Sequence, residues 1–145
     1  MKINRFVIKN KYYGFEVSAP EKWHFEKNTS YSDDVVGNLL EQCKNGKSKG
    51  SAGYEVGDFK LKDSGLPSSA VLEITINCVP GITNEQILSF TSSDYVSFFY
   101  NNLQYKMAKY IFIAPADKKN EIQIRAKYAK VFNNIVSSFK YDLDK

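Results

Sequence analysis

Apolar and polar residues alternate along several segments of the chain, which predicts β-strands with one buried and one wet face. The clearest case is residues 70–79, where Leu72, Ile74 and Ile76 fall on one side and Glu73 on the other. Strict alternation of this kind is typical of an antiparallel sheet that is covered on one side only. We therefore expect this segment to be a strong β-strand.

Further strands are predicted on both sides of this segment. Residues 3–9 and 12–19 predict an N-terminal β-hairpin, because the first is rich in strand formers and the second alternates clearly. A short strand is expected at residues 23–27. Residues 52–62 alternate as well, but the pattern slips by one residue at Gly57, so we expect a β-bulge or a bend there.

Two segments carry the signals of an amphipathic helix. Residues 32–46 offer Ser32 as N-cap and Gly46 as the stop, and residues 128–141 repeat apolar residues at helical spacing. The expected apolar faces are Val35, Val36, Leu39, Leu40 and Cys43 in the first helix, and Tyr128, Val131, Phe132, Ile135, Val136 and Phe139 in the second.

The region between the two helices is predicted to be helical in its first part and extended in its second part. Residues 83–103 predict two helical pieces, because Thr83 can cap a helix and apolar residues follow with a loose helical period. Residues 105–114 and 120–129 both alternate, which predicts a β-hairpin that turns at residues 115–120.

This order of elements predicts an α+β fold. Strands joined by short turns favour an antiparallel sheet, and the intervening helices must cover its apolar faces. The chain has 145 residues, so residues 1–145 are expected to form a single domain with a core of its own. The hydrophobic fraction of 43% and the charged fraction of 25% are those of a globular domain.

Charge and motifs exclude several functions. The net charge of +4 comes from scattered lysines rather than a clustered basic face, so we expect no nucleic-acid binding. No segment approaches the roughly 20 apolar residues of a membrane helix, so no membrane span is expected. Because glycine-rich nucleotide loops and the G-x-S-x-G elbow are also absent, we expect no cofactor.

The compartment stays open at this point. Cys43 and Cys78 allow one disulfide in an exported protein and two buried thiols in a cytoplasmic one, and their spacing matches no metal site. The first residues contain no apolar signal segment. Either the protein is cytoplasmic, or it is exported and its leader is absent from this chain, which would also allow a lipid anchor.

Few side chains are candidates for chemistry. His24, the single histidine, could act as a general base or metal ligand, but no motif surrounds it and alternation turns it outward. Asp33 and Asp34 could bind a cation, although complementing the helix dipole is the simpler interpretation. Glu73 could be a pocket acid, but a wet-face carboxylate is the default for an alternating strand. We assign no catalytic, metal or cofactor residue.

Pro20 and Trp23 have an architectural interpretation. Proline cannot donate to the sheet, so Pro20 should end the second strand. The indole of Trp23, three residues later, can then fold over the end of the sheet and cover the core. An exposed tryptophan would instead indicate a binding hot spot.

The two ends of the chain resemble those of PsbP-like proteins. "YGFEVSAPEKW" is similar to the "G-F-x-x-x-x-P-x-x-W" start of that family, and "YAKVFNNIVSSFKY" is similar to its closing "F-x-x-I-x-x-S-F-K-F". The matching residues are the architectural ones, Pro20, Trp23, Phe132 and Phe139. Residues 28–50 depart from the family pattern.

The resemblance implies an α/β/α sandwich, with helices on both sides of a mostly antiparallel central sheet. Relatives include photosystem II extrinsic subunits, bacterial lipoproteins and a Ran-GTPase-binding protein, which act by binding. We therefore expect a non-catalytic accessory domain that docks a protein partner, and the export of bacterial relatives favours an extracytoplasmic location. A small-molecule or lipid carrier, with its pocket between sheet and helices, is the alternative, followed by a hydrolase that uses His24.

Overall fold

The structure is a computed structural model that describes residues 3–9, 14–20, 22–27, 32–46, 53–61, 67–84, 86–88 and 94–141. Its elements follow the chain in this order: β1 (Ile3–Lys9), β2 (Gly14–Pro20), β3 (Trp23–Lys27), α1 (Asp33–Lys44), β4 (Gly53–Leu61), β5 (Ser69–Cys78), β6 (Gln86–Leu88), β7 (Tyr95–Tyr100), β8 (Leu103–Phe112), the 3-10 helix η1 (Pro115–Asn120), α2 (Glu121–Ser137) and β9 (Lys140–Tyr141).

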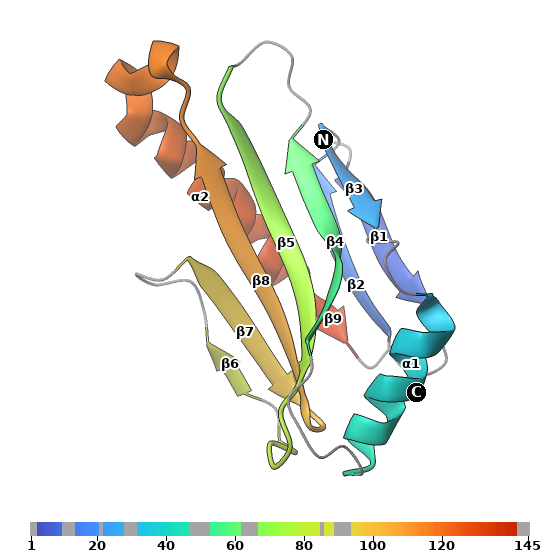
Figure 1. Cartoon of the computed structure of the whole chain (residues 1–145). Helices are drawn as coiled ribbons and strands as arrows, with labels where there is room; N and C mark the ends of the chain where they lie inside the picture. The colour runs from blue at the N-terminus through green and yellow to red at the C-terminus, as the bar shows by residue number, and fades with distance from the viewer. Residues whose placement is uncertain are drawn as a thin grey trace.

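The strands form two antiparallel sheets (Figure 1). The larger one has six strands in the order β3-β4-β5-β8-β7-β6, and the smaller one has the order β1-β2-β9. The N-terminal hairpin is confirmed by the pairing of β1 with β2, and the last strand returns to pair with β2. The two ends of the described chain thus belong to the same small sheet.

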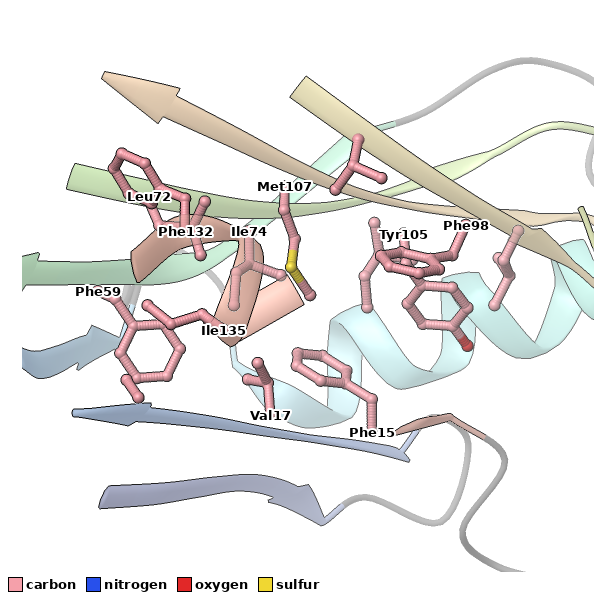
Figure 2. Close-up of a cluster of buried hydrophobic side chains, with 14 of the residues drawn as sticks. Phe15, Val17, Phe59, Leu72, Ile74, Phe98, Tyr105, Met107, Phe132 and Ile135 are labelled. Atoms are coloured by element: carbon pink, nitrogen blue, oxygen red, sulfur yellow. The ribbon is translucent and has the colours of Figure 1, made fainter. Parts of the chain in front are cut away.

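The core lies between the two sheets and the helices (Figure 2). The expected alternation of β5 is confirmed, because Leu72, Ile74 and Ile76 are fully buried while the residues between them are partly exposed. Phe15 and Val17 of β2 face this layer from the opposite side. A sheet with one apolar face therefore gains its cover from the small sheet as well as from helices.

The mixed α+β architecture is confirmed, but the helices are not distributed as the sandwich would require. The buried side chains of α2 contact the core through Phe132 and Ile135, and Cys43 of α1 reaches Cys78 on the buried face of β5. Both described helices thus cover the same face of the large sheet. We call the other face, which carries Val71 and Glu73 of β5, the open face; no helix of the described chain covers it.

Helix α1 begins and ends as its sequence predicts. The hydroxyl of Ser32 accepts a hydrogen bond from the Val35 amide at 3.3 Å, and Gly46 has a positive φ of 71° just beyond the C-terminus. The expected apolar face is narrower than predicted, because Val35 and Leu39 are exposed. The other three apolar residues, Val36, Leu40 and Cys43, are buried.

The β-bulge predicted at Gly57 is confirmed by the register of β4 against β5, which shifts between Glu55 and Gly57. A Cβ at Gly57 would lie 2.5 Å from the carbonyl oxygen of Glu26 and would overlap the ring of Phe25. Close approach of the neighbouring strand β3 is therefore the reason for glycine at this position.

The two helical pieces predicted for residues 83–103 are wrong. Gln86–Leu88 and Tyr95–Tyr100 are strands β6 and β7, which pair with each other, and β7 also pairs with β8. Aromatic and β-branched residues fill Tyr95–Tyr100, and these residues favour a pleated surface that can bury Val96 and Phe98 against neighbouring strands. Tertiary pairing outweighs the loose helical spacing.

The hairpin predicted for residues 105–129 is wrong in its second half. Residues 115–120 form η1, and α2 begins at Glu121 rather than near residue 128. The alternation in 120–129 is coincidental, because Ile122 is 82% exposed while Ile124 packs against the core at helical spacing from Tyr128. Most of the intervening residues are good helix formers.

The architectural residues are placed at the junction of sheet and helix. Trp23 is 2% exposed and packs edge-on against Phe132 and Tyr128 of α2, with ring centroids 5.5 and 6.3 Å away. Phe139, just after α2, stacks on Phe98 at 4.5 Å. Pro20 is the last residue of β2. The rings at both ends of the chain thus face the sheet.

Candidate functional site

The last part of β8 has an edge that no described residue pairs with. Strand β7 pairs with β8 only as far as Tyr95 opposite Ala108, and the Lys109 amide then donates to the Asp94 carbonyl at 2.8 Å. Beyond this point, residues 110–112 pair with β5 on their inner side, and no other described strand pairs with them. In Figure 1, β7 begins partway along β8 and leaves its arrowhead end uncovered on that side.

Three exposed aromatic side chains surround this edge. Tyr95 is 43% exposed, Tyr110 45% and Phe112 56%. They share the open face of the sheet, because Tyr95 lies opposite Ala108 and directly opposed residues point to the same side. We call these three residues the aromatic corner. The Lys106 ammonium lies 4.5 Å from the ring centroid of Tyr95 and extends the group with a cation.

A pocket of about 370 Å³ lies beside the same edge, between β8 and α2. We call it the edge pocket; it is lined by Asp94, residues 109–112, Arg125 and Ala129. Because Ala129 has a small side chain, the flank of α2 does not fill the space next to β8. The pocket is open to solvent, and it carries both apolar and charged groups.

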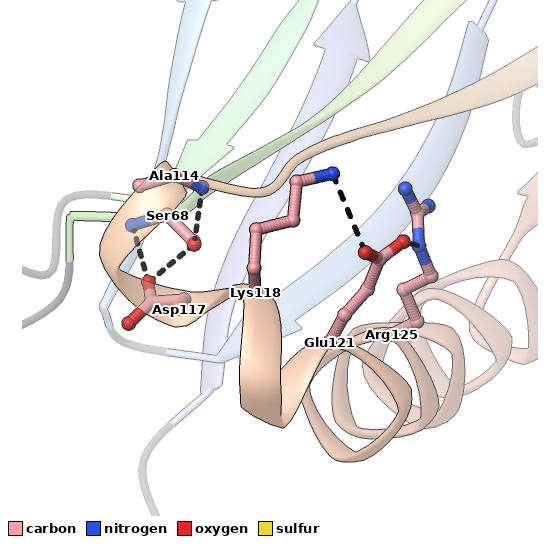
Figure 3. Close-up of polar contacts among 6 residues, drawn as sticks. All are labelled: Ser68, Ala114, Asp117, Lys118, Glu121 and Arg125. Carbon is pink, nitrogen blue, oxygen red and sulfur yellow. Dashed lines mark hydrogen bonds and ion pairs between the residues drawn. The ribbon is translucent and has the colours of Figure 1, made fainter.

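Charge pairing on α2 orients the cation of the pocket (Figure 3). The Arg125 Nε donates to Glu121 Oε2 at 2.7 Å, and the Lys118 ammonium lies 3.5 Å from the other carboxylate oxygen. The hydrogen bond from Arg125, with the charge of Lys118, lowers the pKa of Glu121. Figure 3 shows the two terminal nitrogens of Arg125 directed away from that carboxylate.

The turn after β8 is fixed by buried Ser68. Its hydroxyl donates to Asp117 Oδ2 and accepts from the Ala114 amide at 2.9 Å, while the Ser68 amide donates to the same carboxylate at 3.2 Å (Figure 3). These bonds tie the start of β5 to η1. They therefore hold the exposed end of β8 in a defined position relative to α2.

An acidic group lies elsewhere on the open face. The carboxylate oxygens of Glu55, Asp58 and Glu73 are within 4.8 Å of one another, a set of hard oxygen ligands that a divalent cation could use. Burial, followed by the charge of Glu55, raises the pKa of both Asp58 and Glu73. As expected, Glu73 is on the wet face of its strand.

His24 is also on the open face, as alternation predicts. Its Nε2 lies 3.0 Å from Glu26 Oε1, and the Lys60 ammonium donates to Glu26 Oε2 at 2.6 Å. The hydrogen bonds from Lys60 and His24 lower the pKa of Glu26 to about 2. A hydrolase would need His24 in a cleft, and His24 does not line the edge pocket.

Cys43 and Cys78 form a disulfide that joins α1 to β5, and both residues are buried. Asn102, at the turn between β7 and β8, supports this joint. Its side chain accepts from the Gly81 amide at 2.9 Å and donates to the Lys44 carbonyl at 3.3 Å.

Asp33 and Asp34 are the first two residues of α1, and their side chains lie outside the described part of the structure.

Comparison with known proteins gives no relative from which a site could be transferred. No family model, no curated protein and no solved structure matches the chain. Of the helices in the described residues, none has the length and apolar character needed to cross a membrane.

Sequence reasoning missed the residues of the aromatic corner and the edge pocket. Tyr95 was expected in a helix, Tyr110 and Phe112 were singled out for no role, and Arg125 was expected on a strand. The signal that could have revealed the corner is alternation itself, which puts Tyr110 and Phe112 on the same face and Ile111 on the other.

Proposed function

We propose that this protein is a non-catalytic docking domain that binds a protein partner through the aromatic corner and the edge pocket. The observation that carries the proposal is the position of three exposed rings beside a stretch of β8 with no described partner on its outer side. Aromatic side chains dominate the energetic centres of protein interfaces. Unpaired strand edges, in turn, are common sites for an added strand.

The resemblance to PsbP-like proteins is part of this proposal, but an arrangement with helices on both sides of the sheet is not, because both described helices cover one face of the large sheet. It is supported by the contact between the two matching ends of the chain, where Trp23 packs on Phe132. Members of that family act by binding, which agrees with a docking role. The matching residues are architectural ones that carry no activity, so the proposed binding site does not depend on them.

We also propose that the domain works in an oxidising compartment. The disulfide between Cys43 and Cys78 supports this location, because such bonds persist mainly in exported proteins. This would agree with the extracytoplasmic location of bacterial relatives in the PsbP-like family.

A photoreactive phenylalanine analogue at the position of Phe112 tests the docking role in cells of the native source. We expect it to crosslink one defined partner, because this side chain is the most exposed ring of the corner. The matched control carries the same analogue at Asn38, which is exposed on α1 at the opposite end of the large sheet, and should give no such product.

The double variant Tyr95→Ser/Tyr110→Ser should weaken binding of the partner about thirtyfold and reduce the crosslinked product accordingly, since each residue of an interface centre contributes about 1 kcal/mol. Circular dichroism should show an unchanged fold, because both side chains are exposed. Equal crosslinking from Phe112 and Asn38 would contradict the docking role.

A small-molecule carrier is the second candidate, because the edge pocket has a volume of about 370 Å³ and lies between sheet and helix as such a carrier requires. Native mass spectrometry of protein purified from its source would show a copurified ligand. Ala129→Leu, which fills the pocket, should remove it. The open shape of the pocket favours side chains of a partner over an enclosed ligand.

A further inference from the structure

We propose that the partner supplies an extended segment that adds to the outer edge of β8 at Ile111, an inference that rests on the proposed docking role. The Lys109 amide points outward, since it donates to Asp94. Alternate residues of a strand direct their backbone groups to the same side, so the N–H and C=O of Ile111 also point outward. No described residue bonds to them there.

The register of such a strand determines where its side chains go. A residue directly opposite Ile111 would exchange two backbone hydrogen bonds with it and would share its face of the sheet. That face is the one covered by α2, where Ile111, Ala129 and Arg125 line the edge pocket. The side chain opposite Ile111 therefore enters the pocket, and its two neighbours lie on the open face beside Tyr110 and Phe112.

Charge identifies the side chain that fits. Two of the three charged groups that line the pocket are cations, Lys109 and Arg125, and the third is Asp94. Arg125 uses its Nε for Glu121, and its two terminal amino groups have no partner among the described residues. An acidic side chain can accept hydrogen bonds from these amino groups. The partner segment therefore has an acidic residue opposite Ile111, and the residues directly before and after it are apolar or aromatic.

A blocked peptide of sequence Lys-Thr-Val-Phe-Glu-Val-Thr-Lys tests this assignment by NMR titration of the isotope-labelled protein. We expect saturable binding below millimolar concentration, with the largest amide shifts at residues 110–112. The Glu→Gln peptide should bind about tenfold more weakly, the equivalent of one charged hydrogen bond.

N-methylation separates strand pairing from other modes of binding. A methyl group on the glutamate nitrogen removes the N–H that would donate to the Ile111 carbonyl, and binding should be lost. The matched control carries the methyl group on the next residue, whose N–H points away from β8 in this register. This second peptide should bind nearly as well as the parent.

A charge reversal tests the role of Arg125. Arg125→Glu should weaken binding of the glutamate peptide about tenfold and should favour the same peptide with lysine in place of glutamate. Glu121→Gln, which alters the same cluster but keeps the guanidinium, should leave the affinity for the glutamate peptide nearly unchanged. Arg125 is exposed on α2, so both variants should fold.

The inference is overturned if no peptide binds saturably, if both N-methylated peptides bind alike, or if charge reversal has no effect. It is also overturned if the protein dimerises in sedimentation experiments and Phe112→Ser makes it monomeric, because a second copy would then occupy the edge. If crosslinking at Phe112 persists while the peptides fail, strand addition is wrong and the docking role survives.

Discussion

At the scale of single residues, the open face contains a carboxyl group in an unfavourable position. One oxygen of Asp58 is shielded from solvent and has no hydrogen-bond partner in the described part of the chain, and the carboxylates of Glu55 and Glu73 lie nearby. Burial and the charge of Glu55 raise the pKa of Asp58 above 3.8. The folded state therefore binds a proton more tightly than the unfolded chain does.

This shift predicts that Asp58→Asn stabilises the protein at neutral pH. Between the unfolded and the folded pKa of Asp58 the folded state holds more protons, so stability falls as the pH rises through this window. The amide removes the charge, and we expect a gain of up to about 1 kcal/mol after allowance for solvent screening.

Chemical denaturation at pH 7 and at pH 3 measures the effect of Asp58→Asn. The gain should be present at pH 7 and should shrink at pH 3, where the wild-type carboxyl is largely protonated. A variant that is less stable than wild type at pH 7 would show that the charged form of Asp58 has a stabilising partner.

Gly57 is the second residue whose surroundings predict a measurable effect. Gly57→Ala should destabilise the protein by about 1–3 kcal/mol, because the new methyl group meets the backbone of Glu26 and the ring of Phe25. Gly53→Ala in the same strand is the matched control, because its methyl group meets mainly the Asn77 side chain, which can rotate. Equal losses in urea unfolding would argue against steric conflict at the bulge.

At the scale of elements, sequence reasoning succeeded where local signals and tertiary pairing agree. Helix α1 has a capping serine, a terminal glycine and a buried apolar stripe, and β5 alternates along its whole length. The prediction for strand β7 failed because its aromatic residues fit both a helical and a strand period. Only the pairing of β7 with β8 decides between the two. The beginning of α2 was predicted wrongly because two isoleucines two residues apart give the alternation of a strand. Of these two, only Ile124 faces the core.

The candidate site was harder to predict than the elements that form it. Exposure of Tyr110 and Phe112 depends on where β7 stops pairing with β8, and the edge pocket depends on the position of Ala129 against Ile111. The end of the β7–β8 pairing and the position of Ala129 both depend on how two elements lie relative to each other. In each case one of the two elements was predicted with the wrong secondary structure. Periodicity reports which face a residue occupies, but it does not report whether a neighbour covers that face.

The disulfide that joins α1 to β5 gives a prediction at the scale of elements. Replacing Cys43 and Cys78 together by alanine should lower the free energy of unfolding by about 4 kcal/mol, because the disulfide closes a long loop of the unfolded chain with a sequence separation of 35. Urea unfolding of the wild type with and without reductant, compared with the double variant, measures this loss. If reductant lowers the stability of the double variant as well, its effect does not come from this bond.

At the scale of the whole molecule, aromatic rings join layers that are distant in sequence. Trp23 at the start of β3 packs on α2, and Phe139 contacts rings of both sheets, Phe15 in β2 and Phe98 in β7. These contacts place the N-terminal and C-terminal parts of the described chain in one core. Unfolding is therefore expected to be cooperative across both sheets.

Trp23→Ala should lower the free energy of unfolding by about 3–5 kcal/mol, because it leaves a cavity between β3 and α2. Calorimetry should show a lower melting temperature with a single transition. Ile122→Ser, which replaces an apolar residue that is 82% exposed on the same helix, should change the stability by no more than about 0.5 kcal/mol. A Trp23→Ala protein as stable as the wild type would show that this ring does not stabilise the packing of β3 on α2.

The burial of Trp23 has a practical consequence, because it is the only tryptophan of the chain. Its fluorescence emission comes from a single indole held against Tyr128 and Phe132, so a red shift of the emission maximum would report separation of helix and sheet without any added label. The same signal, followed in a stopped-flow instrument, would time the moment in refolding when the two ends of the molecule meet.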